Sequence, residues 1–175
     1  IEEPMIAVLA DIEMAGVRID SEALAVYAVE LNRKLAELEA AIRGSKVEIV
    51  DYIWYGGDSN YENIEKLKAN ETVQNADMLF GVGGGRACDT VKTLADMLDK
   101  PFFTFPTLAS NCAACTAITV IYNADGSFKE YYYMHGPAYH TFVNTKIIAD
   151  SPEKLLWAGI GDALSKECEV LFASR

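Results

Sequence analysis

Residues 76–98 have the sequence ADMLFGVGGGRACDTVKTLADML, in which an apolar run meets three consecutive glycines and then a segment with helical spacing. The near-continuous apolar run predicts a strand buried on both faces. In the last part, Val91, Leu94 and Leu98 keep the spacing of one helix face, which predicts a helix. The glycines therefore lie where a strand ends and a helix begins.

Gly83, Gly84 and Gly85 leave the backbone bare at this turn, so a bulky anion can approach without meeting a Cβ atom. The N–H groups and the dipole at the start of a helix attract phosphate groups. A tight turn that needs a positive φ is the alternative explanation. Arg86 either adds charge to the site or is simply solvated. The spacing is neither G-x-G-x-x-G nor that of a P-loop, so the turn alone favours phosphate binding only modestly.

Strand-like and helical segments alternate around the glycines. Residues 46–57 and 101–107 have the composition of strands, and residues 59–75 predict a helix begun by Ser59 or Asn60. This order predicts an α/β fold with a Rossmann-like parallel sheet and flanking helices.

The pattern changes beyond residue 107. Two alternating segments flank Asp125-Gly126, which predicts a β-hairpin. Residues 141–149 predict another strand, and residues 151–174 predict a helix with Ser151 as its cap and Pro152 in its first turn.

A helical arm, residues 1–45, precedes this α/β part, residues 46–175, and the character of the sequence changes near Gly44-Ser45. Periodic apolar residues and a terminating Gly16 predict two helices in the arm.

Composition bounds the function. The 175 residues carry a net charge of −11, which disfavours broad binding to a nucleic-acid backbone. No signal peptide or membrane-spanning run is present, and four cysteines do not form a disulfide framework, so we expect a cytoplasmic protein without a membrane partner. Whether it forms a homo-oligomer stays open.

A second polar loop follows the strand at residues 101–107. Thr107, Ser110, Asn111 and Thr116 place small polar groups at the carboxyl end of that strand, where open α/β sheets bind ligands. An ordinary capped loop is the alternative, but its position beside the glycines favours a ligand site.

Three motifs in order resemble the iron-containing alcohol dehydrogenase superfamily in its glycerol dehydrogenase branch. They are GVGGGRACDTVK, FPTLASNCAACTAITVIY and NTKIIADSPEKLLWAGIGDALSK, and the resemblance covers residues 47–175. It implies a fragment of an NAD-dependent dehydrogenase that transfers hydride between NAD and an alcohol such as glycerol or another polyol. It also implies a divalent metal, zinc or iron, that polarises the substrate oxygen.

The resemblance also implies site residues. The pyrophosphate of NAD is expected at Gly83, Gly84, Gly85, Arg86 and Asp89, and the nicotinamide side at Thr107, Ser110, Thr116, Ile118 and Tyr122. The family's substrate-contacting aspartate falls at Cys112, with Asn111 beside it. Cys112 and Cys115 form a C-x-x-C pair that we interpret as loop packing.

Asp162 corresponds to a metal ligand of the family, whose partners are two histidines from a later helical domain. His135 and His140 do not match those positions. Because a catalytic zinc needs about three protein ligands, we expect an incomplete metal site and an inactive or weak enzyme.

The arm resembles a thumb-proximal segment of bacterial family A DNA polymerases, the DNA polymerase I type, from Ile1 to about Arg43. No residue matches the palm carboxylates of that family. Two unrelated resemblances predict an engineered fusion, a natural chimera or joined gene fragments. The alternatives to a dehydrogenase fragment are a polymerase-derived nucleic-acid-binding module and a non-functional chimera.

Overall fold

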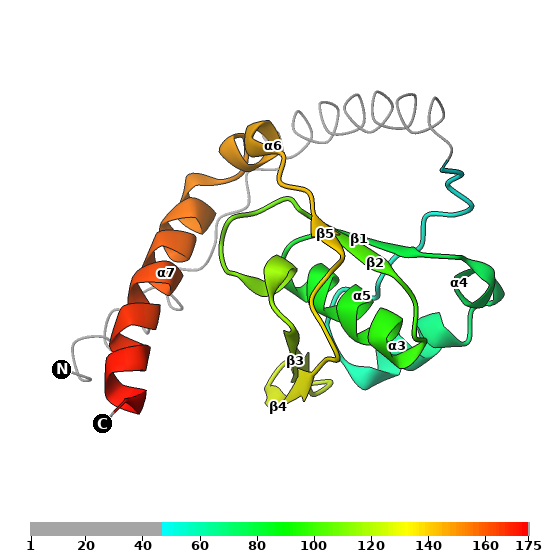
Figure 1. Cartoon of the computed structure of the whole chain (residues 1–175), viewed down its shortest axis with the longest axis horizontal. Coiled ribbons are helices and arrows are strands. Elements are labelled where there is room, and N and C mark those ends of the chain that lie inside the picture. Colours follow the sequence, from blue (N-terminus) through cyan, green and yellow to red (C-terminus); the bar gives the residue numbers. More distant parts are fainter. Residues whose placement is uncertain (1–46, 175) are drawn as a thin grey trace. The chain divides into compact units, whose positions relative to one another are not determined.

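The structure is a computed structural model that describes residues 47–174, so the predicted helices of the arm and the junction at Gly44-Ser45 lie outside the described residues. The chain divides into two compact units, residues 1–49 and residues 50–175. All helices and strands named below belong to the second unit (Figure 1).

A three-stranded parallel sheet contains the glycine turn. Strand β1 (Leu79–Gly83) leads into helix α5 (Gly85–Met97), which leads into strand β2 (Phe102–Pro106). β1 pairs with β2 in parallel, and the short strand β5 (His140–Thr141) pairs with the other edge of β2. The predicted α/β fold with a parallel sheet and flanking helices is confirmed.

Helix α5 covers one face of this sheet. A Cβ atom at Gly81 would lie 3.1 Å from the Val91 Cβ, so strand and helix approach closely there. The predicted burial of β1 on both faces is wrong, because Phe80 and Val82 are 36% and 56% exposed on the opposite face. Aromatic side chains contact one another across the strands of the sheet, including Phe80, Phe103, Phe105 and Phe142.

A β-hairpin follows, as predicted. Strand β3 (Ile118–Tyr122) pairs antiparallel with strand β4 (Phe128–Tyr133). Gly126 has φ +81°, which favours glycine, and the Asp125 carboxylate accepts a hydrogen bond from the Ser127 amide.

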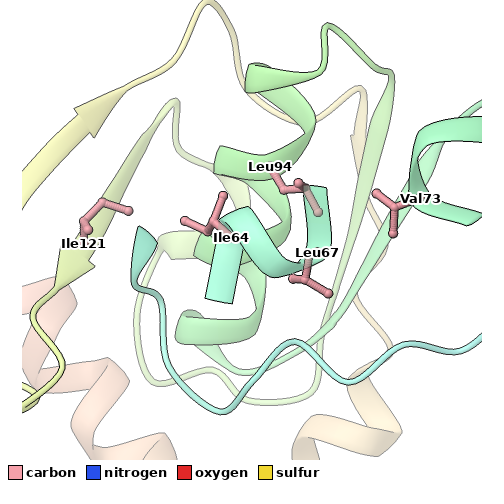
Figure 2. Close-up of a cluster of buried hydrophobic side chains, with 5 residues drawn as sticks. All are labelled: Ile64, Leu67, Val73, Leu94 and Ile121. Atoms are coloured by element: carbon pink, nitrogen blue, oxygen red, sulfur yellow. The ribbon is translucent and has the colours of Figure 1, made fainter. Parts of the chain in front are cut away.

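The predicted helix at residues 59–75 is two helices, α3 (Tyr61–Lys68) and α4 (Glu71–Asn75). Asn60 caps α3, as predicted, and Asn70 breaks the segment because its side chain caps α4 instead of continuing the first helix. Figure 2 shows the cluster that these helices form with α5 and β3. It contains Ile64, Leu67, Val73, Leu94 and Ile121.

Two strand predictions are wrong. Residues 47–57 form no strand, and Val50 and Trp54 are 63% and 72% exposed, because this segment pairs with no strand within residues 47–174. Residues 141–149 contain only the end of β5, followed by helix α6 (Thr145–Ala149). The Asn144 side chain accepts from the amides of Lys146 and Ile147, and this cap starts a helix where the β-branched residues predicted a strand.

The last predicted helix is present as α7 (Glu153–Ala173). Its cap position is Pro152, whereas the Ser151 hydroxyl donates to the Ile148 carbonyl and so ends α6. None of the helices within residues 47–174 is long and apolar enough to cross a membrane.

The core cluster generates the first prediction. Ile64 is fully buried between α3 and α5, so Ile64→Ala should lower the free energy of unfolding by about 2–5 kcal/mol through lost burial and a cavity. The matched control Leu164→Ala removes an exposed side chain from α7 and should change it by less than about 0.5 kcal/mol. Urea denaturation measures both, and equal losses would contradict this assignment of the core.

Candidate functional site

The turn between β1 and α5 is tight enough to require glycine. Gly83 has φ +147°, and a Cβ atom there would lie 2.8 Å from the Cβ of Ala87. Gly84 occupies the cap position of α5 and therefore offers no side chain to cap the helix. The backbone conformation, and not only the space above it, thus explains the first glycine.

The first backbone amides of α5 lack a hydrogen-bond acceptor among the described residues. The Cys88 amide donates to the Gly84 carbonyl at 3.0 Å and begins the hydrogen bonding of the helix. Within residues 47–174, the amides of Gly84, Gly85, Arg86 and Ala87 donate to no protein acceptor. Four such N–H groups, together with the positive end of the helix dipole, suit an anion such as a phosphate.

The β2–β3 loop, residues 107–117, lies directly against this turn. The Thr107 amide donates to the Gly83 carbonyl at 3.0 Å. A Cβ atom on Gly84 would lie 3.1 Å from the Leu108 side chain, and one on Gly85 would lie 2.7 Å from that of Asn111. The structure therefore brings Thr107 and Asn111 to the glycines, as their sequence positions predicted.

Arg86 is neither free nor simply solvated. Its guanidinium group lies 3.4 Å from the Asp58 carboxylate and 4.8 Å from the centre of the Tyr122 ring. Arg86 and Tyr122, both predicted cofactor contacts, are thus side by side. Since the Arg86 side chain is half exposed, the ion pair adds less than about 1 kcal/mol of stability.

Asp89 lies beneath the surface of the site. It is 5% exposed, its Oδ1 lies 3.5 Å from the Lys92 ammonium, and its Oδ2 accepts from the Val120 amide at 3.2 Å. Burial raises the pKa of Asp89 to about 6, while the charge of Lys92 opposes that rise. Both oxygens are occupied by protein donors, so a direct contact to a cofactor is the predicted role that this environment supports least.

Lys92 is a buried residue that the sequence analysis did not single out. Its side chain is fully buried, and its ammonium donates to the carbonyl groups of Ala113 and Ile118 at 2.5 and 2.9 Å. It also donates to the Thr116 hydroxyl at 3.3 Å. Burial lowers the pKa of Lys92, and the Asp89 charge opposes this. The sequence did contain a signal for it: Asp89 and Lys92 are oppositely charged, three residues apart, and on the buried face of the helix.

The rest of the β2–β3 loop forms a short 3₁₀ turn, η1 (Ala113–Cys115). Cys112 precedes it with an exposed side chain, and Cys115 donates to the Cys112 carbonyl at 3.3 Å. Thr116 and Ile118 accept hydrogen bonds from the buried Lys92 ammonium. Ser110 is half-buried where the loop approaches α7.

Helix α7 passes close to the same loop. A Cβ atom at Gly159 would overlap the Ala109 carbonyl, so α7 and the loop touch through their backbones. Asp162 follows one turn later, and its carboxylate lies 3.3 Å from the Lys166 ammonium. The Asp162 carboxylate raises the pKa of Lys166, and the Glu169 carboxylate, 3.9 Å from the ammonium, adds to that rise.

The described residues do not complete a metal site. No group of three histidine, cysteine or acidic side chains within residues 47–174 could hold a metal ion. His135 hydrogen-bonds to Asp96 at 3.1 Å, and His140 stacks on Phe103. Asp162 therefore stands as a single carboxylate paired with a lysine, which does not fit a zinc or iron ion.

The fold and the site define an α/β protein that places a glycine turn and a polar loop at the carboxyl edge of a parallel sheet. The model of the family "Iron-containing alcohol dehydrogenase" matches residues 8–143. The chain belongs to this family. The match includes most of the arm, so it also covers residues that the sequence analysis assigned to a separate origin.

Curated relatives and solved structures agree with this family. The chain is 36% identical to glycerol dehydrogenase from Escherichia coli over 127 residues, or 73% of this chain and 35% of the relative. A probable glycerol dehydrogenase from Sinorhizobium meliloti is 35% identical with a TM-score of 0.61, covering 63% of this chain and 31% of that one. The chain thus spans about a third of the length of the curated relative.

A more distant structure shares only the fold. Sulfoacetaldehyde reductase from Bifidobacterium kashiwanohense, solved in complex with NAD+, is 15% identical with a TM-score of 0.58. The superposed region covers 72% of this chain and 39% of the reductase.

The glycine turn generates a prediction about stability. Gly83→Ala forces a side chain into a backbone region that disfavours it and against Ala87, so it should cost about 1–3 kcal/mol. Gly136→Ala, where an added Cβ meets nothing within 4 Å, is the matched control and should change stability by less than about 0.5 kcal/mol. Thermal unfolding that shows no difference between the two variants would contradict the turn geometry.

Asp89 generates a prediction about pH. Because its folded pKa of about 6 is above the ordinary value, the folded protein takes up a proton as pH falls through 6, and this contribution to stability is lost as pH rises again. Between pH 7 and pH 5 the wild type should gain about 1 kcal/mol relative to Asp89→Asn, which lacks this titration. Urea unfolding at pH 5, 6 and 7 measures the free energy of unfolding of both proteins, and a wild-type value that does not rise relative to that of Asp89→Asn toward pH 5 would refute the raised pKa.

Proposed function

We propose that residues 47–174 are the dinucleotide-binding part of an NAD-dependent polyol dehydrogenase. The observation that carries this proposal is the set of four unengaged amides, Gly84 to Ala87, at a helix start that only glycine can form. They would hold the diphosphate of NAD, with Arg86 beside them as a positive charge. The bound NAD would accept or return the hydride of an alcohol.

The nicotinamide side of the cofactor would lie along the β2–β3 loop and the start of β3. Thr107 and Tyr122 flank the glycine turn, since Thr107 bonds to Gly83 and Tyr122 packs under Arg86. Ser110, Thr116 and Ile118 continue along the same loop. The hydrogen bonds from Lys92 to Thr116 and Ile118 give this stretch a fixed geometry, which supports its use as a binding surface.

The proposed substrate is glycerol or a related small alcohol, on the similarity to glycerol dehydrogenases. Asn111 lies against Gly85, so its amide group is close to where the cofactor would pass. Cys112 stands where the resemblance expects an aspartate and offers a thiol instead of a carboxylate. We therefore propose a substrate contact by Asn111 and a changed preference at Cys112.

The proposal includes no step through a metal. Asp162 would contribute one oxygen ligand to a zinc or iron ion, but residues 47–174 supply no further ligand beside it. The role of Asp162 stays a prediction from the resemblance.

The remaining proposals concern the whole chain. We propose residues 46–175 as the dehydrogenase part and residues 1–45 as a separate arm, although the family match extends into that arm. A polymerase origin of the arm stays a prediction, and no contact among the described residues favours nucleic-acid binding. The four cysteines are free thiols, which is consistent with a cytoplasmic location.

A titration of NAD tests the proposal. Gly85→Val would place a branched side chain among the open amides and against Asn111, so it should weaken NAD binding at least about tenfold by blocking the diphosphate. Gly136→Val changes a glycine with open space around it and should leave the affinity within about twofold of the wild type. Isothermal calorimetry with each protein gives the Kd.

Two outcomes would contradict the proposal. One is a wild type that does not bind NAD at millimolar concentration. The other is a Gly85→Val variant that remains folded and binds NAD as well as the Gly136→Val control does.

A further inference from the structure

The ammonium group of Lys92 is enclosed by protein on all sides. The side chain has no exposed surface, and it lies in the middle of α5, between the helix and the segment that links η1 to β3. Removing an ammonium from water is costly unless oxygen atoms replace its hydration. The surroundings of Lys92 therefore need to supply several acceptors.

Four oxygen atoms do so. One is the Asp89 carboxylate at 3.5 Å, on the preceding turn of the same helix. The other three come from a single segment, residues 113–118: two carbonyl groups, of Ala113 and Ile118, and the Thr116 hydroxyl. Lys92 thus connects α5 to three points of a segment that has little regular structure of its own.

Asp89 extends the same connection. Its second oxygen accepts from the Val120 amide in β3, so the Asp89–Lys92 pair holds the chain from residue 113 to residue 120 against α5. The Thr116 hydroxyl also lies 3.2 Å from the Ile118 carbonyl, which binds the segment to itself. A buried ion pair is a weak source of net stability compared with apolar side chains of the same volume. Its clearest physical effect here is to fix where this segment lies.

The position of Lys92 on α5 gives that effect a consequence for the site. The helix starts at the glycine turn, and Lys92 follows Gly85 by seven residues, about 10 Å along the axis. One rigid helix therefore carries the open amides at its start and the anchor of Thr116 and Ile118 further on. Lys92 thus helps to set the distance between the proposed diphosphate and nicotinamide contacts, together with the Thr104 hydroxyl, which donates to the Ala114 carbonyl at 2.8 Å.

We propose that Lys92 is a positioning residue for the dinucleotide, which holds residues 113–118 at a fixed place relative to the glycine turn. This inference rests on the proposed function. Lys92 itself touches no ligand, because its ammonium is enclosed by the protein. Removing it should leave the diphosphate contacts intact and weaken the contacts to the nicotinamide.

The test compares two ligands that differ only in that ring, NAD and ADP-ribose. Lys92→Met keeps an unbranched apolar chain, one atom shorter, and removes the ammonium. We expect it to weaken NAD binding at least tenfold and to change ADP-ribose binding less than threefold. Hydrogen exchange at the amides of residues 113–120 should also become faster in this variant, in the absence of any ligand.

Thr93→Val is the matched control. The Thr93 hydroxyl makes a buried 2.7 Å hydrogen bond to Thr119, which joins the same helix to the same strand without involving residues 113–118. This variant should lower the melting temperature but keep the ratio of NAD to ADP-ribose affinity within twofold of the wild type. A general loss of packing between α5 and β3 would instead change both variants alike.

The outcomes separate the two proposals. A wild type that binds neither ligand would overturn the proposed function, and this inference with it. A wild type that binds both, with an unchanged affinity ratio in Lys92→Met, would overturn the inference alone. If Lys92→Met does not fold, Lys92→Gln repeats the comparison with hydrogen-bond donors retained. Failure of both variants to fold would also overturn the inference, because Lys92 would then be needed for the whole fold.

Discussion

The close approach of the β2–β3 loop to the start of α5 is the constraint on which the rest of the site depends. At Gly84 and Gly85 the loop side chains of Leu108 and Asn111 occupy the space that a Cβ atom would need. Gly83 adds a backbone conformation that other residues avoid. The turn therefore carries no side chains for steric reasons, and the amides of Gly84 to Ala87 have no acceptor among the described residues.

The interior beneath this turn differs from the rest of the core. Around Ile64 and Leu94 the buried side chains are aliphatic, and their contacts are non-directional. Beneath the site, buried polar groups are joined by directional hydrogen bonds. Thr93 bonds to Thr119, and Thr104 donates to the Ala114 carbonyl. Lys92 donates to the carbonyl groups of Ala113 and Ile118. Such contacts define one arrangement of loop and helix, because any slip leaves a buried polar group without a partner. A single arrangement of loop and helix would suit a site that contacts both ends of a long ligand.

The sequence predicted the parts of this fold that local signals determine. The apolar run before the glycines, the helix after them and the Asp125-Gly126 hairpin all have strong local patterns, and all are present. The segment at residues 47–57 has an equally strong β composition, yet no strand within residues 47–174 pairs with it, and it forms no strand there. At residues 141–149 a single cap, Asn144, outweighed the β-branched residues.

The site was predictable in position but not in detail. The turn and the polar loop meet at the sheet edge, as parallel topology requires. The sequence did not predict the ion pair of Arg86 or the buried environments of Asp89 and Lys92. Each of these depends on a contact with a residue more than 20 positions away in the sequence. Asp162 shows the same limit, since only the structure places its helix against the β2–β3 loop.

The most direct test of this account is a nitrogen–proton NMR titration of the assigned wild-type protein with NAD. We predict that the largest chemical-shift changes fall on the amides of Gly84, Gly85, Arg86 and Ala87, since these donors gain a phosphate acceptor. Changes that leave these four amides unmoved while NAD binds elsewhere would contradict the central claim.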